Sequence, residues 1–147
     1  MGTKLPPGHH TVTPGMVVPG VAKLIDFLKE AFGGECCERH EGPGGHIMHA
    51  EVRFKDSSVM MGEPMPGWDP MPCMLSLYVD DVDATYARAI AAGAKSLETP
   101  ADQFYGHRTA RVQDPSGNRW SIRTVIEDVS AEEMQRRIAA MNPPEAT

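Results

Sequence analysis

The sequence has few cysteines, few aromatic residues and no long apolar run. The three cysteines are Cys36, Cys37 and Cys73, and an odd number with two adjacent members forms neither a disulfide framework nor a paired metal-ligand spacing. No apolar stretch is long enough to span a bilayer, and the first ten residues lack the apolar run of a signal peptide. These absences predict a cytoplasmic protein with reduced thiols and no membrane partner.

Basic residues are also in deficit, with 14 Lys and Arg against 20 Asp and Glu, for a formal net charge of -6. A nucleic-acid binder normally presents a basic face to the phosphates, so no nucleic-acid partner is expected. The net charge does not exclude a small anionic ligand, because the charge around a site can oppose the net charge. With 147 residues, of which 41% are hydrophobic, the chain suits one domain with its own core.

Two amphipathic helices are predicted at matching places in the two halves. The first begins near Pro19 and ends at Gly33, with an apolar face made by Val21, Leu24, Ile25, Leu28 and Phe32. The second begins after Asp81 and ends at Gly93, with an apolar face made by Val82, Tyr86, Ala89 and Ile90. The two terminal glycines lie about sixty residues apart, which indicates an internal duplication.

Strand patterns complete the repeat. The expected strands are Thr11–Val18, Glu35–His40, Ile47–Phe54 and Ser58–Gly62, then Met74–Val79, Lys95–Leu97, His107–Gln113 and Arg119–Thr124. The sequence thus predicts one α+β domain over residues 1–147, with a first βαβββ module at about 9–63, a linker at 64–72 and a second module at about 73–126. Ser130 and Glu133 form a capping box that opens a C-terminal helix over about 130–141.

Alternation along the strands separates an apolar face from a mixed one. The mixed face carries His49, Glu51, Ser76, Tyr78, Arg111, Ser121 and Arg123. Antiparallel sheets often have one solvated side, so plain solvent exposure and the lining of a ligand cleft are both consistent with this pattern.

Three segments resemble the glyoxalase, bleomycin-resistance and extradiol-dioxygenase family, the vicinal oxygen chelate superfamily. They are Val18–Gly33, Leu77–Asp83 and Asp114–Trp120. Thr13-Pro14, Ile47–Glu51 and Asp102–Gly106 are similar to its PhnB-like branch. The resemblance covers about residues 10–125. It implies two βαβββ modules that form a cupped mixed sheet around a small-molecule site, and commonly a homodimer.

The resemblance also implies four metal-ligand positions in the metal-using members. Here they fall on Thr13, on Glu51 or the neighbouring His49, on Met74 and on Ser121. Thr, Met and Ser are poor ligands for a divalent ion that prefers imidazole and carboxylate, so we expect no metal and no other cofactor. The alternative is a metal-dependent lyase or dioxygenase-like enzyme with the displaced ligands His10, His49 and Glu51.

His49 and Glu51 project from the same face of one strand and are candidates for a catalytic acid–base pair. A salt bridge from Glu51 to Arg53 or Arg111 explains the same pattern. Arginine offers a planar donor fork for carboxylate or phosphate. The candidate ligand-binding residues are Thr13, Trp68, Met74, Ser76, Tyr78, Tyr105, Arg111, Ser121 and Arg123.

The leading functional hypothesis is that the protein binds a small organic molecule in the sheet cleft without a metal. In one interpretation this molecule is an anion. It would sequester that molecule or transform it, so the sequence leaves a binding protein and an enzyme as open alternatives. A third alternative is a fold kept mainly as a dimeric interaction module, since a fold by itself fixes no single chemistry.

Overall fold

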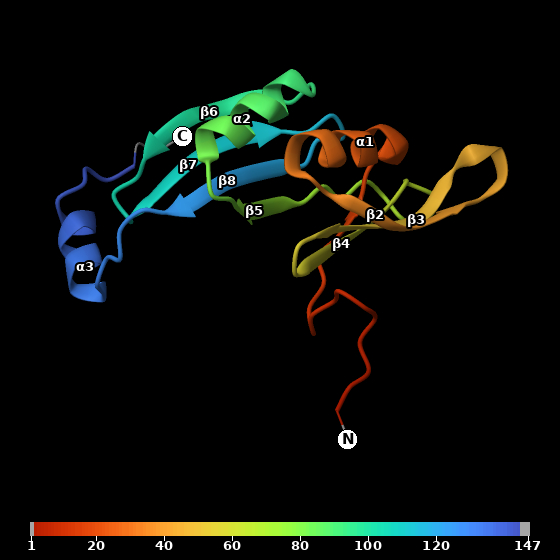
Figure 1. The fold of residues 1–147 in the computed structure, drawn as a ribbon, viewed down its shortest axis with the longest axis horizontal. Helices are drawn as coiled ribbons and strands as arrows, with labels where there is room; N and C mark the ends of the chain where they lie inside the picture. The colour runs from red at the N-terminus through yellow and green to blue at the C-terminus, as the bar shows by residue number, and fades with distance from the viewer. Residues whose placement is uncertain (1, 145–147) are drawn as a thin grey trace.

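Each half of the chain folds as one strand, a helix and three more strands. The computed structural model describes residues 2–144. The first module contains β1 (Gly15–Val17), α1 (Val21–Phe32), β2 (Glu35–Glu41), a 3₁₀ turn (Pro43–Gly45), β3 (Ile47–Phe54) and β4 (Ser57–Gly62). The second contains β5 (Met74–Tyr78), α2 (Val82–Ala91), β6 (Lys95–Asp102), β7 (His107–Gln113) and β8 (Arg119–Val125), and α3 (Ala131–Ala139) follows it (Figure 1).

The strands form two four-stranded mixed sheets, ordered β1-β4-β3-β2 and β5-β8-β7-β6. In each module the first strand runs parallel to the last, and the other neighbours are antiparallel. The register also shifts at matching places, between Cys36 and Glu38 and between Ser96 and Glu98. The predicted α+β fold of two βαβββ modules is confirmed, with the sheet divided into two hydrogen-bonded halves.

Helix α1 forms where the apolar spacing predicts it. Val21, Leu24 and Leu28 are fully buried, and Gly33 ends the helix with a φ of 70° that favours glycine. The helix begins two residues after Pro19, which lies outside its first turn. Gly20 takes a left-handed conformation with a φ of 70°, which turns the chain before the helix begins at Val21.

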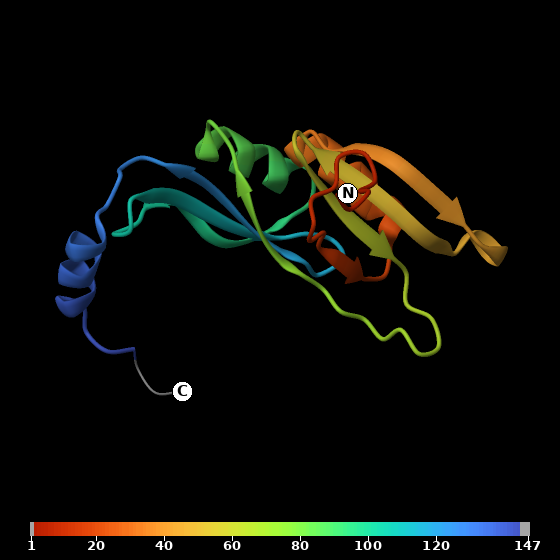
Figure 2. The ribbon, with the colours of Figure 1, turned by 90° about the horizontal axis from the view of Figure 1, so that it is seen from below.

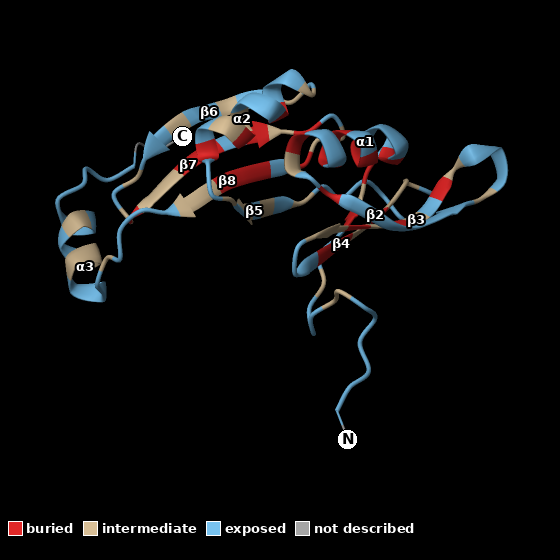
Figure 3. Cartoon of the chain, viewed as in Figure 1, coloured by how far each residue is buried: buried red, intermediate tan, exposed pale blue. Residues whose placement is uncertain are grey.

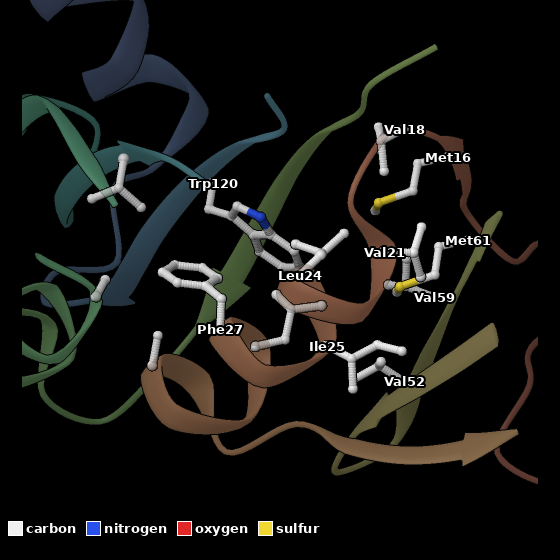
Figure 4. Packing of buried hydrophobic residues seen from close by; sticks show 14 of the residues in the cluster. Met16, Val18, Val21, Leu24, Ile25, Phe27, Val52, Val59, Met61 and Trp120 are labelled. Carbon is white, nitrogen blue, oxygen red and sulfur yellow. The ribbon is translucent and has the colours of Figure 1, made fainter. Parts of the chain in front are cut away.

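One apolar junction joins the two modules. Trp120 of β8 is 2% exposed, and its ring lies 5.0 Å from that of Phe32 and 5.7 Å from that of Phe54, measured between centroids. Figure 4 shows its indole directed toward Leu24 of α1. Helices α1 and α2 also pack together, and Arg88 of α2 donates a hydrogen bond to the Ala31 carbonyl at 3.4 Å. An aromatic side chain of this size contributes a large part of the buried area of a small core.

A buried carboxylate holds Trp120 in place. Asp114 is 3% exposed, and its Oδ2 accepts from the Trp120 indole N–H and from the Asn118 side chain, each at 2.9 Å. Its Oδ1 accepts from the backbone N–H groups of Ser116 and Asn118 at 2.9 and 3.0 Å. Ser116 in turn donates to the Pro19 carbonyl of the first module at 2.7 Å. Four hydrogen bonds offset the cost of burying this charge.

Several element boundaries differ from the predicted ones for local reasons. The first strand begins at Gly15 rather than Thr11, because the preceding residues bind to β3, β4 and the turn between them. Strand β6 continues past Leu97 to Asp102 in spite of Pro100. It is an edge strand, where the missing N–H of proline is tolerated.

The C-terminal helix lies beyond the end of the second sheet (Figure 2). Ser130 accepts from the Glu133 N–H at 3.1 Å, so the Ser130 half of the predicted capping box forms, whereas the Glu133 carboxylate pairs with Arg136 and Arg137. The helix ends at Ala139. Arg137 anchors it through an ion pair with Glu127 at 2.6 Å. Within residues 2–144, no helix combines the length and the apolarity that crossing a membrane requires.

Replacing Asp114 tests the junction between the modules. Asp114→Ala leaves the Trp120 indole N–H and the Asn118 amide without their partner, so we expect a loss of roughly 3–5 kcal/mol in the free energy of unfolding. Urea denaturation measures this loss. The control is Asp69→Ala, which removes an exposed linker carboxylate and should change stability little. Equal stability of the two variants would contradict the assigned role of Asp114.

Candidate functional site

Each sheet packs one face against the helices and leaves the other face open. Buried residues concentrate on α1, β7 and β8, whereas the linker and both ends of the described chain are mostly exposed (Figure 3). On β3, Ala50 and Val52 are buried in the core, and the alternate residues His49 and Glu51 lie on the open face. The predicted division into an apolar and a mixed face is therefore present in the first sheet.

On the open face of the first sheet, Glu51 lies between two imidazoles. Its Oε2 is 2.8 Å from His9 Nε2, and its Oε1 is 3.0 Å from His49 Nε2. The Glu51 and His9 side chains are only 14% and 5% exposed. Burial raises the pKa of the Glu51 carboxyl, but hydrogen bonds and charge from His9 and His49 lower this pKa by more, so the net shift is downward.

The segment that carries His9 folds back onto this face. The Ser58 hydroxyl donates to the Gly8 carbonyl at 3.0 Å, and Arg53 donates to the Pro7 carbonyl at 3.1 Å. His10 lies apart from the cluster, with its Nε2 2.8 Å from the Asp56 carbonyl oxygen. The predicted combination of His10 with His49 and Glu51 is therefore wrong, because the chain directs the neighbouring His9 toward Glu51.

The predicted salt bridge of Glu51 to an arginine is also absent from residues 2–144. Arg53 binds the backbone of the folded-back segment, and Arg111 lies in the other module, 3.6 Å from Glu98. Both carboxylate oxygens of Glu51 are instead bound by imidazoles, Oε2 by His9 and Oε1 by His49.

The open face of the second sheet carries basic and aromatic side chains. Arg123 donates to the Ser121 hydroxyl through Nη2 at 3.0 Å and Nε at 3.3 Å, and its Nη1 lies 3.4 Å from His107 Nδ1. The guanidinium lies 5.9 Å from the ring centroid of Tyr105. The His107 ring makes edge contacts with Tyr78 and Tyr105 at centroid distances of 6.0 and 5.3 Å. Among the described residues, no carboxylate lies within salt-bridge distance of Arg123.

Two cavities adjoin this region. A hollow of about 220 Å³ on the second sheet is lined by five predicted ligand-binding residues: Met74, Ser76, Arg111, Ser121 and Arg123. A crevice of about 800 Å³ runs between the modules and is lined by two further predicted positions, Thr13 and Tyr78, together with Ser76. Ser76 belongs to both, so the two spaces are neighbours.

Two predicted ligand-binding residues, Tyr105 and Trp68, lie outside these cavities, as do the predicted catalytic residues His49 and Glu51. Tyr105 makes its edge contact with His107 and does not line the hollow. Trp68 is 63% exposed in the linker and makes a β-bridge with Met65. The linker turns back on itself at this bridge, which holds Trp68 away from both cavities in this chain.

The positions that the family resemblance assigns to a metal do not form a suitable donor set. Met74 is 81% exposed, and Thr13 Oγ1 is engaged with His9 Nδ1 at 3.0 Å. Ser121 Oγ accepts from the Arg123 guanidinium, whose positive charge would repel a cation there. Of these four positions only Glu51 provides a strong ligand for a divalent ion.

His9, Glu38 and His40 lie on the first open face but were missed by the sequence prediction. Glu38 lies directly opposite Glu51 in the β2–β3 register, and its Oε2 is 3.8 Å from His49 Nε2. Strand alternation would have placed Glu38 on this face only if the bulge after Cys36 had been known. His9 and Glu51 are 42 positions apart in the sequence, and no local sequence pattern predicts their contact.

Cys73 behaves as a structural thiol. It donates to the Gly15 carbonyl at 2.9 Å, which ties β5 to the first module. Burial raises the pKa of this thiol, and the negative charge of Asp114 raises it further. A raised thiol pKa disfavours the nucleophilic thiolate, so Cys73 is not a candidate catalytic residue.

The fold and the sequence are similar to those of known proteins. TioX from Micromonospora sp. ML1 is 22% identical, with a TM-score of 0.64, and the match covers 82% of this chain and 100% of that one. TnmS3, an antibiotic-binding protein from Streptomyces sp. CB03234, is 27% identical, with a TM-score of 0.62, and the match covers 80% of this chain and 99% of that one.

The uncharacterized protein Mb0911c of Mycobacterium bovis is 33% identical in an alignment of 140 residues, and the match covers 88% of this chain and 92% of that one. A family model described as Glyoxalase/Bleomycin resistance protein/Dioxygenase superfamily matches residues 8–122. Together with the two βαβββ modules, these matches show that the chain belongs to the glyoxalase, bleomycin-resistance and dioxygenase superfamily.

Proposed function

We propose that the protein binds a small organic anion on the open face of its second sheet, and that it sequesters this molecule without the help of a metal. The observation that carries the proposal is the Arg123 guanidinium. It is oriented by Ser121 and His107 but has no carboxylate partner among residues 2–144. A preorganised and unpaired guanidinium is suited to a ligand carboxylate or phosphate.

The neighbouring side chains favour a ligand with a flat apolar part. Tyr78 and Tyr105 flank His107 beside Arg123, and Met74 contributes an adaptable apolar surface to the hollow. The hollow of about 220 Å³ suits an anionic ring, and the adjoining crevice of about 800 Å³ offers room for a larger substituent.

The similarity to the antibiotic-binding protein TnmS3 supports binding over catalysis, as does the absence of an acid–base pair beside Arg123 within residues 2–144. We also propose assignment to the PhnB-like branch, on the motifs Thr13-Pro14, Ile47–Glu51 and Asp102–Gly106. A cytoplasmic location is proposed from the three unpaired cysteines.

Replacing Arg123 tests the ligand site. We expect 1-naphthoate to bind the wild-type protein better than the neutral 1-naphthamide does. Arg123→Met should weaken naphthoate binding roughly 10–100-fold, because a hydrogen bond to a charged group contributes about 1.5–3 kcal/mol. Isothermal titration calorimetry measures both affinities.

Arg39→Met is the matched control, since Arg39 is an exposed arginine of the first module that pairs with Glu41. It should bind naphthoate as the wild type does. Equal binding of the acid and the amide, or equal losses in the two arginine variants, would argue against an anion site at Arg123. Circular dichroism spectra verify that both variants are folded.

We further propose that a second copy of the chain covers the open faces. Trp68, Met71 and Met74, at the end of the linker and the start of β5, are 63%, 68% and 81% exposed, and we infer that they make up an apolar patch for the partner chain. The first open face carries Glu38 and Glu51, whereas the second carries the arginines of the hollow. A two-fold axis can therefore place the acidic face of one chain opposite the basic face of its partner.

Light scattering after gel filtration tests the dimer. The wild-type protein should elute with twice the chain mass of 16.0 kDa, and Met71→Lys should convert it to monomer by placing a charge in the apolar patch. Met141→Lys is the control, because Met141 is 51% exposed near α3 and outside the patch. A monomeric wild type, or equal dissociation by both variants, would refute the proposed interface.

A second candidate function is transformation of the bound molecule by His49 and Glu51 as an acid–base pair. The observation in its favour is their hydrogen bond of 3.0 Å, which orients the imidazole. In one chain this pair lies on the first sheet and Arg123 on the second, so this function requires the dimer.

A further inference from the structure

The first module places two carboxylates face to face. Glu38 of β2 is the cross-strand partner of Glu51 of β3, and like charges in directly opposite positions destabilise a sheet. The second module has a different pair at the same place of the repeat, just after the shared register shift. There Glu98 faces Arg111, and the two form an ion pair at 3.6 Å. The first module thus has a glutamate at both positions, whereas the second module pairs a glutamate with an arginine.

An imidazole lies between these two carboxylates. His49 Nε2 is 3.0 Å from Glu51 Oε1 and 3.8 Å from Glu38 Oε2, and one ligand atom from each of the three residues lies within 4.8 Å of the others. In a tetrahedral zinc site with bonds near 2.1 Å, ligand atoms are about 3.4 Å apart. Small side-chain rotations would bring the three atoms to that spacing.

Two further histidines hold the carboxylate oxygens that face away from this point. His9 Nε2 lies 2.8 Å from Glu51 Oε2, and Thr13 Oγ1 lies 3.0 Å from the other nitrogen of His9. His40 Nε2 lies 3.4 Å from Glu38 Oε1. Outer partners of this kind orient metal-binding carboxylates and raise affinity.

We propose that Glu38, His49 and Glu51 bind a divalent cation of the Zn²⁺ class between strands β2 and β3. The imidazole favours Zn²⁺ or a similar transition metal over Mg²⁺ and Ca²⁺, which prefer oxygen ligands alone. In a single chain the His49 and Glu38 side chains are 38% and 49% exposed, which leaves the remaining coordination positions open to water. The bound cation offsets the negative charge of Glu38 and Glu51, as Arg111 offsets that of Glu98 in the second module.

This site is separate from the proposed anion site. All its ligands come from the first module, whereas Ser121 and Arg123 belong to the second. It also differs from the four positions that the family resemblance assigns to a metal, of which only Glu51 is shared. Naphthoate binding and zinc binding can therefore fail or succeed independently.

Zinc titration of the untagged full-length chain tests the proposal. Cys36 and Cys37 are changed to serine in every protein used, because exposed thiols beside Glu38 would compete for the metal. After treatment with EDTA and its removal, ZnCl₂ should bind with one equivalent per chain in calorimetry and raise the melting temperature. Replacing Zn²⁺ with Co²⁺ gives a visible absorption that reports the coordination geometry.

Single substitutions identify the ligands. Glu38→Gln and His49→Ala should abolish measurable binding, and His9→Ala should weaken it roughly 10–100-fold, as expected for a residue that positions a ligand. His10→Ala is the matched control and should bind as the parent does, because His10 contacts only the Asp56 carbonyl among its side-chain hydrogen bonds. No zinc binding by the parent, unchanged binding in Glu38→Gln and His49→Ala, or loss of binding in His10→Ala would each overturn the proposal.

Discussion

The packing of Trp120 against the first module is the constraint on which the rest of the structure depends. Its ring contacts Phe32 and Phe54, and its indole N–H reaches the buried Asp114 carboxylate. This junction and the packing of α1 on α2 bury the apolar side of both sheets. The other side of each sheet is open to water and to ligands, so polar residues there reduce the stability of the fold little.

The two modules share a backbone plan but differ in the charges that they present. Equivalent positions after the shared register shift hold Glu51 in the first module and Arg111 in the second. The first face thus gathers carboxylates and imidazoles, and the second gathers guanidinium groups and aromatic rings. The two modules therefore present different sets of side chains on one shared backbone plan.

The sequence alone predicted the fold well, because helical and strand periodicity depend on local pattern. Strands Ile47–Phe54 and His107–Gln113 have the predicted bounds, and Trp120 lies in the core as its alternation requires. The partners of Glu51 could not be predicted. His9 reaches it through a folded-back segment, and Glu38 faces it because of a bulge, and neither feature leaves a local signature.

Separate titrations of the labelled Met71→Lys variant with 1-naphthoate and with Zn²⁺, followed by nuclear magnetic resonance, test most directly whether the two open faces bind different ligands. This variant is used because the two faces cannot meet across a dimer interface in a monomer. The account predicts that naphthoate shifts the Arg123 Nε–H and Ser121 amide signals and leaves the β2–β3 signals in place. It predicts that Zn²⁺ shifts the Glu38 and Glu51 amides and the His49 imidazole, and leaves the second sheet unchanged. Overlapping responses to the two probes, or no response in either sheet, would contradict it.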